Sequence, residues 1–599
     1  MIFQGQVANN ETDRTISNIL LTITFTIVSI LGNPFLYDQV NSGRQIAGTL
    51  KKIDPELFPN DYVVAAFEHY RSIFYDGLSL LARSLNFEAF KLESLIFYLY
   101  LLSKYAIVIS LLYISRTLSK SIWLFILLAA WSCHPKSIPV GGPGGGAWIF
   151  QPLLTHNDIA FIILMFSLYQ LLKKDSLIFW ILIGVTVFVH SLYAFHFILC
   201  VIPLIMHAES NSKRQWVGVL IFSLCCLAYL SFYAPPKMTS EEGKIFLEVE
   251  GNSGHISLFS QRPIHWLRII LLAFVSTLSH FNFTKSNESC KRLIWSAISG
   301  ALVSILLSIV ALYSHSVLMN LFQPMRMFIW VTLFFYIVLI NATVEAFNHS
   351  SLFGIMLSAV LFLITIYSSW TPAISAVCLG FLSIRLLFQE ASARNNLKIE
   401  IGLKFVLSLI SAFLILSLMV KGASAYFSIR GLILTVSSVV SLILLLSESM
   451  LNKYKFAVAS LFISFALLVA SLDRHEYYSR SANEDWTAIR RWSQANTSKT
   501  DTFITPPEEN TFRSIALRTS VSERNIETIW ASPYSYIKNK TNADQAARAY
   551  TSRSSDVEYL YQLARKWHCN YVISKGQVTV KEPPVYKMGT YQIFKVPEI

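Results

Sequence analysis

The residues best suited to chemistry begin with three carboxylates, Asp38, Asp54 and Asp61, in the polar stretch Phe35–Asn86. Carboxylates beside a membrane can hold a divalent cation such as Mg²⁺ or Mn²⁺, because hard cations prefer oxygen ligands, or act as a general base on a hydroxyl. Asp38 lies just past the first apolar segment and is the candidate base. Asp61 is the second catalytic candidate, and capping of an expected helix is its equal alternative.

Histidines form a second group. His134 and His156 flank the sequence GGPGGG at 141–146, and His190 and His265 lie at the ends of later apolar segments. Glycine and proline break a helix, and irregular backbone survives at membrane depth only where it is buried in protein or lines a wet cavity. A single histidine near the membrane interface is usually a packing residue. Several histidines on the same side of the membrane predict a polar substrate site. None has the HxxxH spacing of a metal-ligand pair.

Arg326 is the strongest cationic candidate. It lies in NLFQPMRMFIW, near the start of an apolar segment, with Gln323 close by. A charge at membrane depth is costly and is usually functional or paired. A guanidinium can grip a lipid phosphate through two parallel hydrogen bonds, and Gln323 could share that site. The alternative is an arginine that extends its charged end to the interface and binds nothing.

Composition identifies the elements that position these residues. The 599 residues are 54% hydrophobic and 14% charged, whereas soluble proteins carry roughly a quarter charged residues. The chain is therefore expected to be a polytopic α-helical membrane protein. Its net charge of +13 comes largely from short loops between apolar segments, so nucleic-acid binding is excluded. Seven cysteines, mostly inside apolar segments, indicate neither a disulfide framework nor a zinc site.

The apolar segments predict about 13–15 transmembrane helices, counted against the roughly 20 residues that a bilayer requires. The first is expected to be an uncleaved span. Residues 176–207 fit either two short helices or one long tilted helix. The segments lie at 16–32, 93–115, 121–133, 157–172, 176–189, 192–207, 215–233, 264–281, 293–313, 324–345, 350–368, 371–389, 401–420, 428–447 and 454–471.

Basic residues in alternate loops predict the orientation. They cluster on one side, which should be cytoplasmic together with the amino terminus. A first outer loop at 34–92 and everything after about 472 then lie outside. Within that loop, apolar residues spaced by three and four predict an interfacial helix with one apolar face. These residues are Val63, Phe67, Tyr70, Phe74, Leu78 and Leu81.

Two domains are expected: a transmembrane domain at 1–471 and an extracytoplasmic α/β domain at 472–599. In the second, polar segments alternate between helical and strand patterns. The helices are predicted at Asp485–Ala495 and Asp556–Trp567, and the strands at Asp501–Thr505 and Asn570–Ser574. A final hairpin is predicted at Val585–Val596, with Met588 and Gly589 at its turn.

The chain resembles the GT-C class of integral-membrane glycosyltransferases in this plan of a first span, an acidic outer loop, many spans and an outer domain. The segments that carry the resemblance are WTAIRRWSQANTSKTDTFITPPEENTFRSIALR, GGGAWIFQPLLTHND followed later by His190, and LFQPMR. The resemblance implies transfer of a sugar from a polyprenyl-phosphate donor, with an acidic residue of the first outer loop as catalyst. Asp38 occupies that place, but Gln39 follows it, so the paired acidic motif of the class is absent.

These observations lead to one expected function and two rivals. The expectation is an enzyme of the bacterial inner membrane that moves a sugar from a polyprenyl-phosphate lipid to a glycan, lipid or protein acceptor in the periplasm. Asp38 would be the base, Arg326 and His265 would hold the phosphate, and the other histidines would line the cavity. A transporter, flippase or assembly factor for an envelope polysaccharide is the first rival. A structural protein whose outer domain binds a partner is the second.

Overall fold

The structure is a computed structural model that describes residues 11–348 and 484–597 apart from short gaps. The predicted spans between 350 and 471 and the site candidates Asp38 and His134 lie outside the described residues. The gaps are 32–34, 36, 38–39, 60, 62–63, 66–71, 86–90, 120, 134–153, 208–211, 234–239, 241–242, 245–246, 248–257, 260, 262, 285, 315, 510, 524–544, 577 and 579–582.

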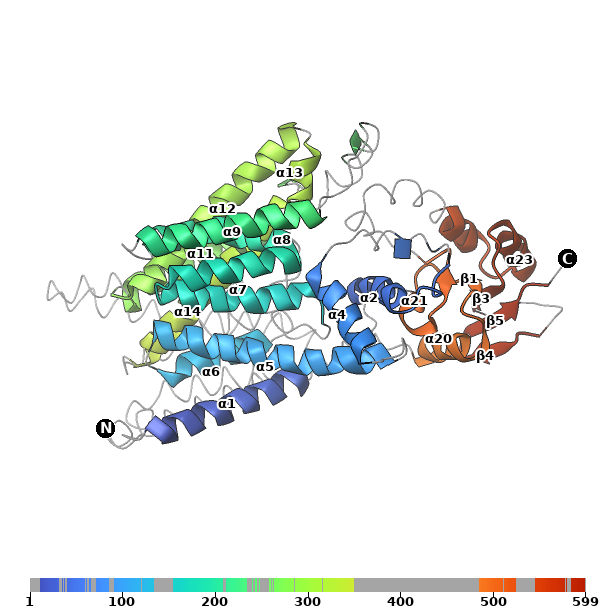
Figure 1. Ribbon diagram of the computed structural model, residues 1–599, viewed down its shortest axis with the longest axis horizontal. Coiled ribbons are helices and arrows are strands. Elements are labelled where there is room, and N and C mark those ends of the chain that lie inside the picture. The colour runs from blue at the N-terminus through green and yellow to red at the C-terminus, as the bar shows by residue number, and fades with distance from the viewer. Residues whose placement is uncertain are drawn as a thin grey trace, which may run out of the picture.

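Long apolar helices make up the first part of the chain (Figure 1). If the helix at Ser176–His207 is counted as one, six helices in the described ranges are long and apolar enough to cross a membrane, as in a multi-pass membrane protein. The helices predicted at 93–115, 215–233, 264–281 and 293–313 are confirmed. The bundle comprises α1 (Glu11–Leu31), α5 (Leu92–Leu118), α6 (Ile122–Cys133), α7 (His156–Leu172), α8 (Ser176–His207), α9 (Ser212–Tyr233), α11 (Pro263–Phe283), α12 (Glu288–Ser314) and α14 (Phe328–Asn348).

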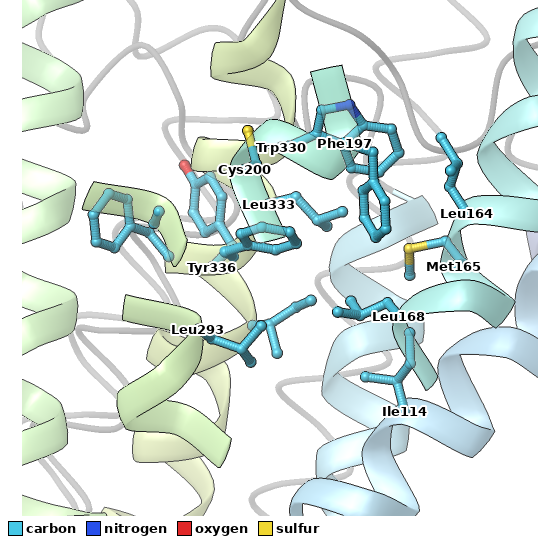
Figure 2. Packing of buried hydrophobic residues seen from close by; sticks show 14 of the residues in the cluster. Ile114, Leu164, Met165, Leu168, Phe197, Cys200, Leu293, Trp330, Leu333 and Tyr336 are labelled. Atoms are coloured by element: carbon cyan, nitrogen blue, oxygen red, sulfur yellow. The ribbon is translucent and has the colours of Figure 1, made fainter. Parts of the chain in front are cut away.

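The helix α14 lies at the centre of the bundle. Its side chains are buried continuously from its start to Val344. Its Trp330 stacks on Phe161 of α7, with 5.5 Å between ring centroids. Figure 2 shows Trp330 and Tyr336 packed among side chains of neighbouring helices, such as Phe197. A helix that is apolar on every side is stable only when other helices surround it, so this packing also fixes the turn that precedes α14.

The helix α8 is broken at His190, whose backbone angles are φ −157° and ψ 88°. Trp180 lies before the break and Phe195 after it, yet both rings contact Phe222 of α9, at 5.4 and 6.2 Å between centroids. In a straight helix residues 180 and 195 would be about 22 Å apart. The two limbs therefore fold back beside each other, which supports the alternative of two short helices at 176–207.

The basic loops gather at one end of the bundle. Arg116 near the end of α5 donates to Asn18 of α1 at 2.6 Å, and Asn287 donates to a carbonyl at the end of α5 at 2.8 Å. Tyr113 stacks on Tyr169 near the end of α7. The C-terminal strands and helices lie beyond the opposite end of the bundle (Figure 1). Basic loops and C-terminal region are thus separated by the length of the helices.

The first polar segment folds into α2 (Val40–Ile53) and α4 (Ile73–Ser84). The prediction of one helix from Val63 to Leu81 is wrong, because the backbone of Ser72 is extended and no helix can continue through it. The Ser72 hydroxyl donates to the carbonyl of Val189 at 2.7 Å, immediately before the break in α8. This tertiary contact explains why local periodicity failed here.

The faces of α4 also differ from the prediction. Tyr75, Leu78 and Ala82 form its buried side, whereas Leu81 is 39% exposed and Leu80 is 60% exposed. The helix therefore has one apolar side against the bundle and a second one that faces away from the protein. An exposed apolar side of this kind suits a helix at the edge of a bilayer.

The C-terminal region contains a five-stranded sheet in the described residues, with strand order β2-β1-β3-β5-β4. The strand β1 is parallel to β2 and β3, and β3-β5-β4 is antiparallel. The predicted helices, strands and final hairpin of this region are confirmed. The elements are α20 (Glu484–Asn496), β1 (Thr502–Ile504), α21 (Phe512–Ala516), β2 (Thr519–Ser520), a helix at 545–552, α23 (Val557–Lys566), β3 (Tyr571–Lys575), β4 (Tyr586–Met588) and β5 (Tyr591–Lys595).

Alternate residues of the strands pack on opposite faces of the sheet. Ile504 and Val572 join a cluster with α23, whereas Phe503 and Ile573 join a cluster with Trp486 of α20. The sheet therefore has an apolar layer on each side. The helix α20 covers one face and α23 covers the other.

Candidate functional site

A group of polar side chains lies at the end of the bundle nearest the C-terminal region. They come from α4, the start of α7, the break in α8 and the turn before α14. Such residues are rare between apolar helices and usually mark a site. We call this group the polar cluster: Tyr75, His156, His190, Tyr193, His196, Gln323 and Arg326.

Tyr75 joins the first polar segment to the bundle. Its hydroxyl lies 3.0 Å from Nδ1 of His156 and donates a hydrogen bond to Oε1 of Gln45 on α2. Because the hydroxyl proton is used on Gln45, Nδ1 of His156 is the donor of the remaining contact. That assignment leaves Nε2 of a neutral His156 ring as an acceptor.

Three rings form a continuous stack. His156 stacks on His190 with 4.6 Å between ring centroids, and His190 stacks on Tyr193 at 4.4 Å. The non-helical backbone of His190 places its ring between the other two. The break in α8 therefore has a local consequence, because it brings one histidine of each helix into contact.

The start of α7 is held by a carboxylate. Asp158 accepts from the backbone N–H and hydroxyl of Thr155 at 2.9 and 2.8 Å, which forms a capping box. The buried Lys104 supplies a positive charge that acts on this carboxylate. Asp158 thus fixes the turn that carries His156, and a structural role accounts for it.

Arg326 lies in the 3-10 turn η2 (Pro324–Met327), directly before α14. Its side chain is partly buried, and its charge acts on the rings of His156, His190 and His196. No residue that the structure describes forms a salt bridge or hydrogen bond with its guanidinium. A partly buried cation without a carboxylate partner among the described residues favours binding of an anion.

Two further polar atoms beside this turn are buried without a hydrogen-bond partner among the described residues. They are Nδ1 of His196 and Oε1 of Gln323. The other ring nitrogen of His196 lies 2.7 Å from the carbonyl of Phe322, so the ring holds the turn in place. An unpaired buried polar atom costs about 1–3 kcal/mol, so both atoms favour a polar ligand or water beside Arg326.

Gln323 adopts the left-handed conformation, with φ 51° and ψ 58°. Non-glycine residues adopt it rarely, and strained positions of this kind concentrate at functional sites. Pro324 follows, and its carbonyl accepts from Ser304 of α12 at 2.7 Å. The strained Gln323 thus begins the turn, and the hydrogen bond from Ser304 to the carbonyl of Pro324 holds the turn against α12.

Asp61 lies away from the polar cluster, in the contact with the C-terminal region. Its Oδ1 accepts from the backbone N–H of Val64 at 3.2 Å, and its Oδ2 lies 2.6 Å from Nε of Arg513. Both side chains are almost fully buried. Arg513 also contacts Glu523 at 2.7 Å. These partners match the capping alternative, and we treat Asp61 as a structural residue below.

Other contacts extend the same interface. Lys499 lies 2.7 Å from Asp54, whose hydrogen bond raises the pKa of Lys499. Leu517 packs into an apolar cluster with Leu50 and Phe58. The C-terminal region therefore packs directly on the segment that supplies Tyr75 to the polar cluster.

The remaining candidates are partly placed. His265 lies at the start of α11, beside Trp266, whose ring contacts Phe328 at the start of α14. It thus lies at the same end of the bundle as the polar cluster. Within the described ranges, no three His, Cys, Asp or Glu side chains are grouped to hold a metal ion. Of the three carboxylates expected to hold a divalent cation, Asp54 and Asp61 have lysine and arginine partners at the interface, and Asp38 is outside those ranges.

Replacement of Tyr75 by phenylalanine tests the core of the polar cluster. The change removes the hydroxyl shared by Gln45 and His156, and is expected to cost about 1–3 kcal/mol of stability. Thermal unfolding of the purified protein, with hydrogen exchange over residues 73–84, measures the effect. Tyr98→Phe is the matched control, because Tyr98 is 65% exposed. Equal stability of the Tyr75 variant and the wild type would contradict the assigned role.

Comparison with known proteins does not narrow the function. No protein-family model matches the chain, and no curated protein matches it significantly. The function is therefore argued from the geometry of the polar cluster and from the sequence resemblance.

Proposed function

We propose that the protein is a membrane-embedded glycosyltransferase that moves a sugar from a polyprenyl-phosphate lipid to an envelope glycan, lipid or protein acceptor. The observation that carries the proposal is Arg326, a partly buried cation without a described partner. The histidine and tyrosine rings of the polar cluster lie within reach of its charge. This environment suits a phosphate, which a guanidinium can bind through two parallel hydrogen bonds.

The depth of the turn favours a phosphate that is attached to a lipid. Ser304 bonds to the turn about ten residues before α12 ends at Ser314. At 1.5 Å per residue, the turn lies about 15 Å below the end of that helix. A phosphate with an apolar tail can reach such a depth while its tail stays in the bilayer.

The chemistry follows from the groups present. The bond between the sugar's anomeric carbon and the phosphate oxygen breaks, and a new bond forms between that carbon and the acceptor oxygen. Negative charge develops on the departing phosphate, where Arg326 stabilises it. The acceptor hydroxyl loses its proton to a base, and Asp38 is the proposed base on the sequence argument alone.

The arrangement of charge supports a location in a bacterial inner membrane. The basic loops lie at the end of the bundle remote from the C-terminal region. If the positive-inside rule applies, that end faces the cytoplasm and the C-terminal region faces the periplasm. The polar cluster then opens toward the periplasmic side.

Lipid retention and transfer, measured together, test the proposal. The protein is reconstituted into nanodiscs containing polyprenyl-phosphate sugar, retained lipid is identified by native mass spectrometry, and transfer is followed with a labelled sugar. The wild type is expected to retain the lipid and to transfer sugar. Asp38→Asn is expected to retain the lipid and lose transfer, whereas the matched Asp54→Asn keeps both.

Three outcomes would overturn the proposal. The wild type could retain no polyprenyl-phosphate lipid, or Asp38→Asn could transfer at the wild-type rate. The lipid could also be retained and moved between leaflets without any transfer, which would favour the flippase alternative.

A further inference from the structure

A cleft on the C-terminal region lies far from the polar cluster in sequence and is not used by the proposed chemistry. It has a volume of about 580 Å³, within the range of ligand sites in proteins. It is formed by one side of α20 and by the edge strand β4. Its lining residues are Glu484, Thr487, Ala488, Arg491, Trp492 and Tyr586.

Helical spacing explains how α20 can serve both the core and the cleft. The lining residues recur three and four positions apart, which places them on one side of the helix. Trp486 and Ile489 lie on another side and are buried in the cluster against the sheet. The ring of Trp486 lies 5.3 Å from Tyr591 of β5. The buried side therefore holds α20 in place while the other side remains available.

Two aromatic rings stack on each other in the cleft, so a ligand can pack only on an outer face of the pair, which we call the platform. Trp492 and Tyr586 are parallel within 10°, with 5.3 Å between their centroids. Both are only partly buried. The C–H groups on one face of a pyranose ring are apolar and pack well on such flat rings, while tryptophan N–H and tyrosine O–H groups remain able to form hydrogen bonds.

The polar residues of the cleft fit a neutral ligand with many hydroxyls. Arg491 supplies donors, Glu484 supplies acceptors, and the Thr487 hydroxyl can do either. A phosphate would meet the negative charge of Glu484 as well as Arg491. A peptide added to the sheet edge would find only three residues in β4, which offer few backbone hydrogen bonds.

The two walls of the cleft are fixed relative to each other. The turn between β4 and β5 contains Gly589 at φ +53°, and a β-carbon there would overlap the carboxylate of Asp485 on α20. Glycine adopts this backbone conformation at little cost, whereas a larger residue would be strained there and would displace the Asp485 carboxylate. The hairpin that carries Tyr586 thus lies against the first turn of α20, and the platform is formed before any ligand arrives.

We propose that this cleft binds a saccharide, with one sugar ring on the Trp492–Tyr586 platform and its hydroxyls on Arg491 and Glu484. Saccharide binding by itself is independent of the proposed transferase activity. The use of that saccharide as the acceptor rests on the proposed function. Saccharide binding by the cleft and the proposed transferase activity can therefore fail separately.

The test is a titration of the full-length protein in lipid nanodiscs. Detergents with sugar headgroups are left out, because they would compete for the cleft. The probes are oligosaccharides of glucose, mannose, galactose and N-acetylglucosamine, and binding is followed by saturation-transfer NMR and calorimetry. The wild type is expected to bind at least one of them.

Matched variants locate the binding. Trp492→Ala is expected to weaken affinity about tenfold or more, and Trp492→Phe only a few-fold, because it keeps a flat ring. Arg491→Gln is expected to weaken affinity several-fold, whereas Arg565→Gln on the exposed side of α23 leaves it unchanged. Hydrogen exchange over 586–595 checks that the hairpin remains folded in each variant.

Several results would overturn the inference. They are the absence of binding to every probe, unchanged affinity in Trp492→Ala, or an equal loss in Arg565→Gln. Binding of an extended peptide that saccharides do not displace would assign the cleft to a different ligand. Lipid retention in the Trp492→Ala nanodiscs separates these results from a failure of the proposed transferase.

Discussion

Arg326→Gln is expected to lower sugar transfer by about two to three orders of magnitude, the loss seen when one charge-stabilising donor is removed from an active site. Arg326 lies directly before the buried helix α14, and no described residue pairs with it. Its removal therefore leaves no described carboxylate unpaired, and the fold should keep its stability. Retained lipid should fall as well, because the phosphate loses its only nearby described cation in the polar cluster.

Two comparisons make the result specific. Arg326→Lys should retain part of the activity, since an ammonium keeps the charge but lacks the planar fork that matches a phosphate. Arg292→Gln makes the same change in α12 near the basic end of the bundle and should have no effect on transfer. If Arg326→Gln transferred the labelled sugar at the wild-type rate, the role of Arg326 on which the proposed function depends would be contradicted.

Arg513→Met is expected to destabilise the contact between the C-terminal region and the first polar segment by about 3–5 kcal/mol, because it breaks a buried ion pair on one side only. The Arg513 guanidinium lies 2.6 Å from Asp61 and 2.7 Å from Glu523, and it also donates to the carbonyl of Ser520. The Asp61 and Glu523 side chains are 0% and 4% exposed. The variant would leave both charges buried without their cation.

Hydrogen exchange measures this effect, with faster exchange expected in α2, α21 and the strand β2. Arg565→Met, an exposed arginine on α23, is the control and should change nothing. Neutral partners should recover much of the loss, so Arg513→Met combined with Asp61→Asn and Glu523→Gln is expected to exchange more slowly than Arg513→Met alone. An equal effect in the single and triple variants would show that the ion pairs do not hold this contact.

The same interface reaches the polar cluster through one short segment. Arg513 pairs with Asp61, α21 packs against α2, and Gln45 on α2 accepts from Tyr75. Loss of the Arg513 contact should therefore also weaken the position of Tyr75. Measurement of sugar transfer together with hydrogen exchange in Arg513→Met would show whether docking of the C-terminal region supports the polar cluster.

Elements set by nearby residues could be predicted from the sequence. The helix predicted at Asp485–Ala495 forms at Glu484–Asn496, and the final hairpin turns at Gly589 as expected. Apolar length likewise located α9 and α11. In each case the pattern of a single short segment determines the structure.

Contacts between distant residues could not be predicted in this way. His156 and His190 were expected on one side, but their stack depends on the break in α8. Tyr75 was missed because its partner His156 lies 81 residues away. His196 was missed although an ionisable residue inside an apolar segment is itself a signal. Asp61 had a capping alternative from its local sequence, and only the fold supplies Arg513, 452 residues along the chain.

The break in α8 has a consequence for the surrounding lipid. The limb before His190 begins at Ser176, is only about 21 Å long and exposes Ile178, Ile181 and Val185 on its outer side. A bilayer has a hydrocarbon core of about 30 Å, so this short limb would impose hydrophobic mismatch on it. Local thinning is one way a membrane relieves such mismatch. The headgroup plane would then dip beside the polar cluster, and a carrier lipid could bring its phosphate down to Arg326 without leaving its own leaflet.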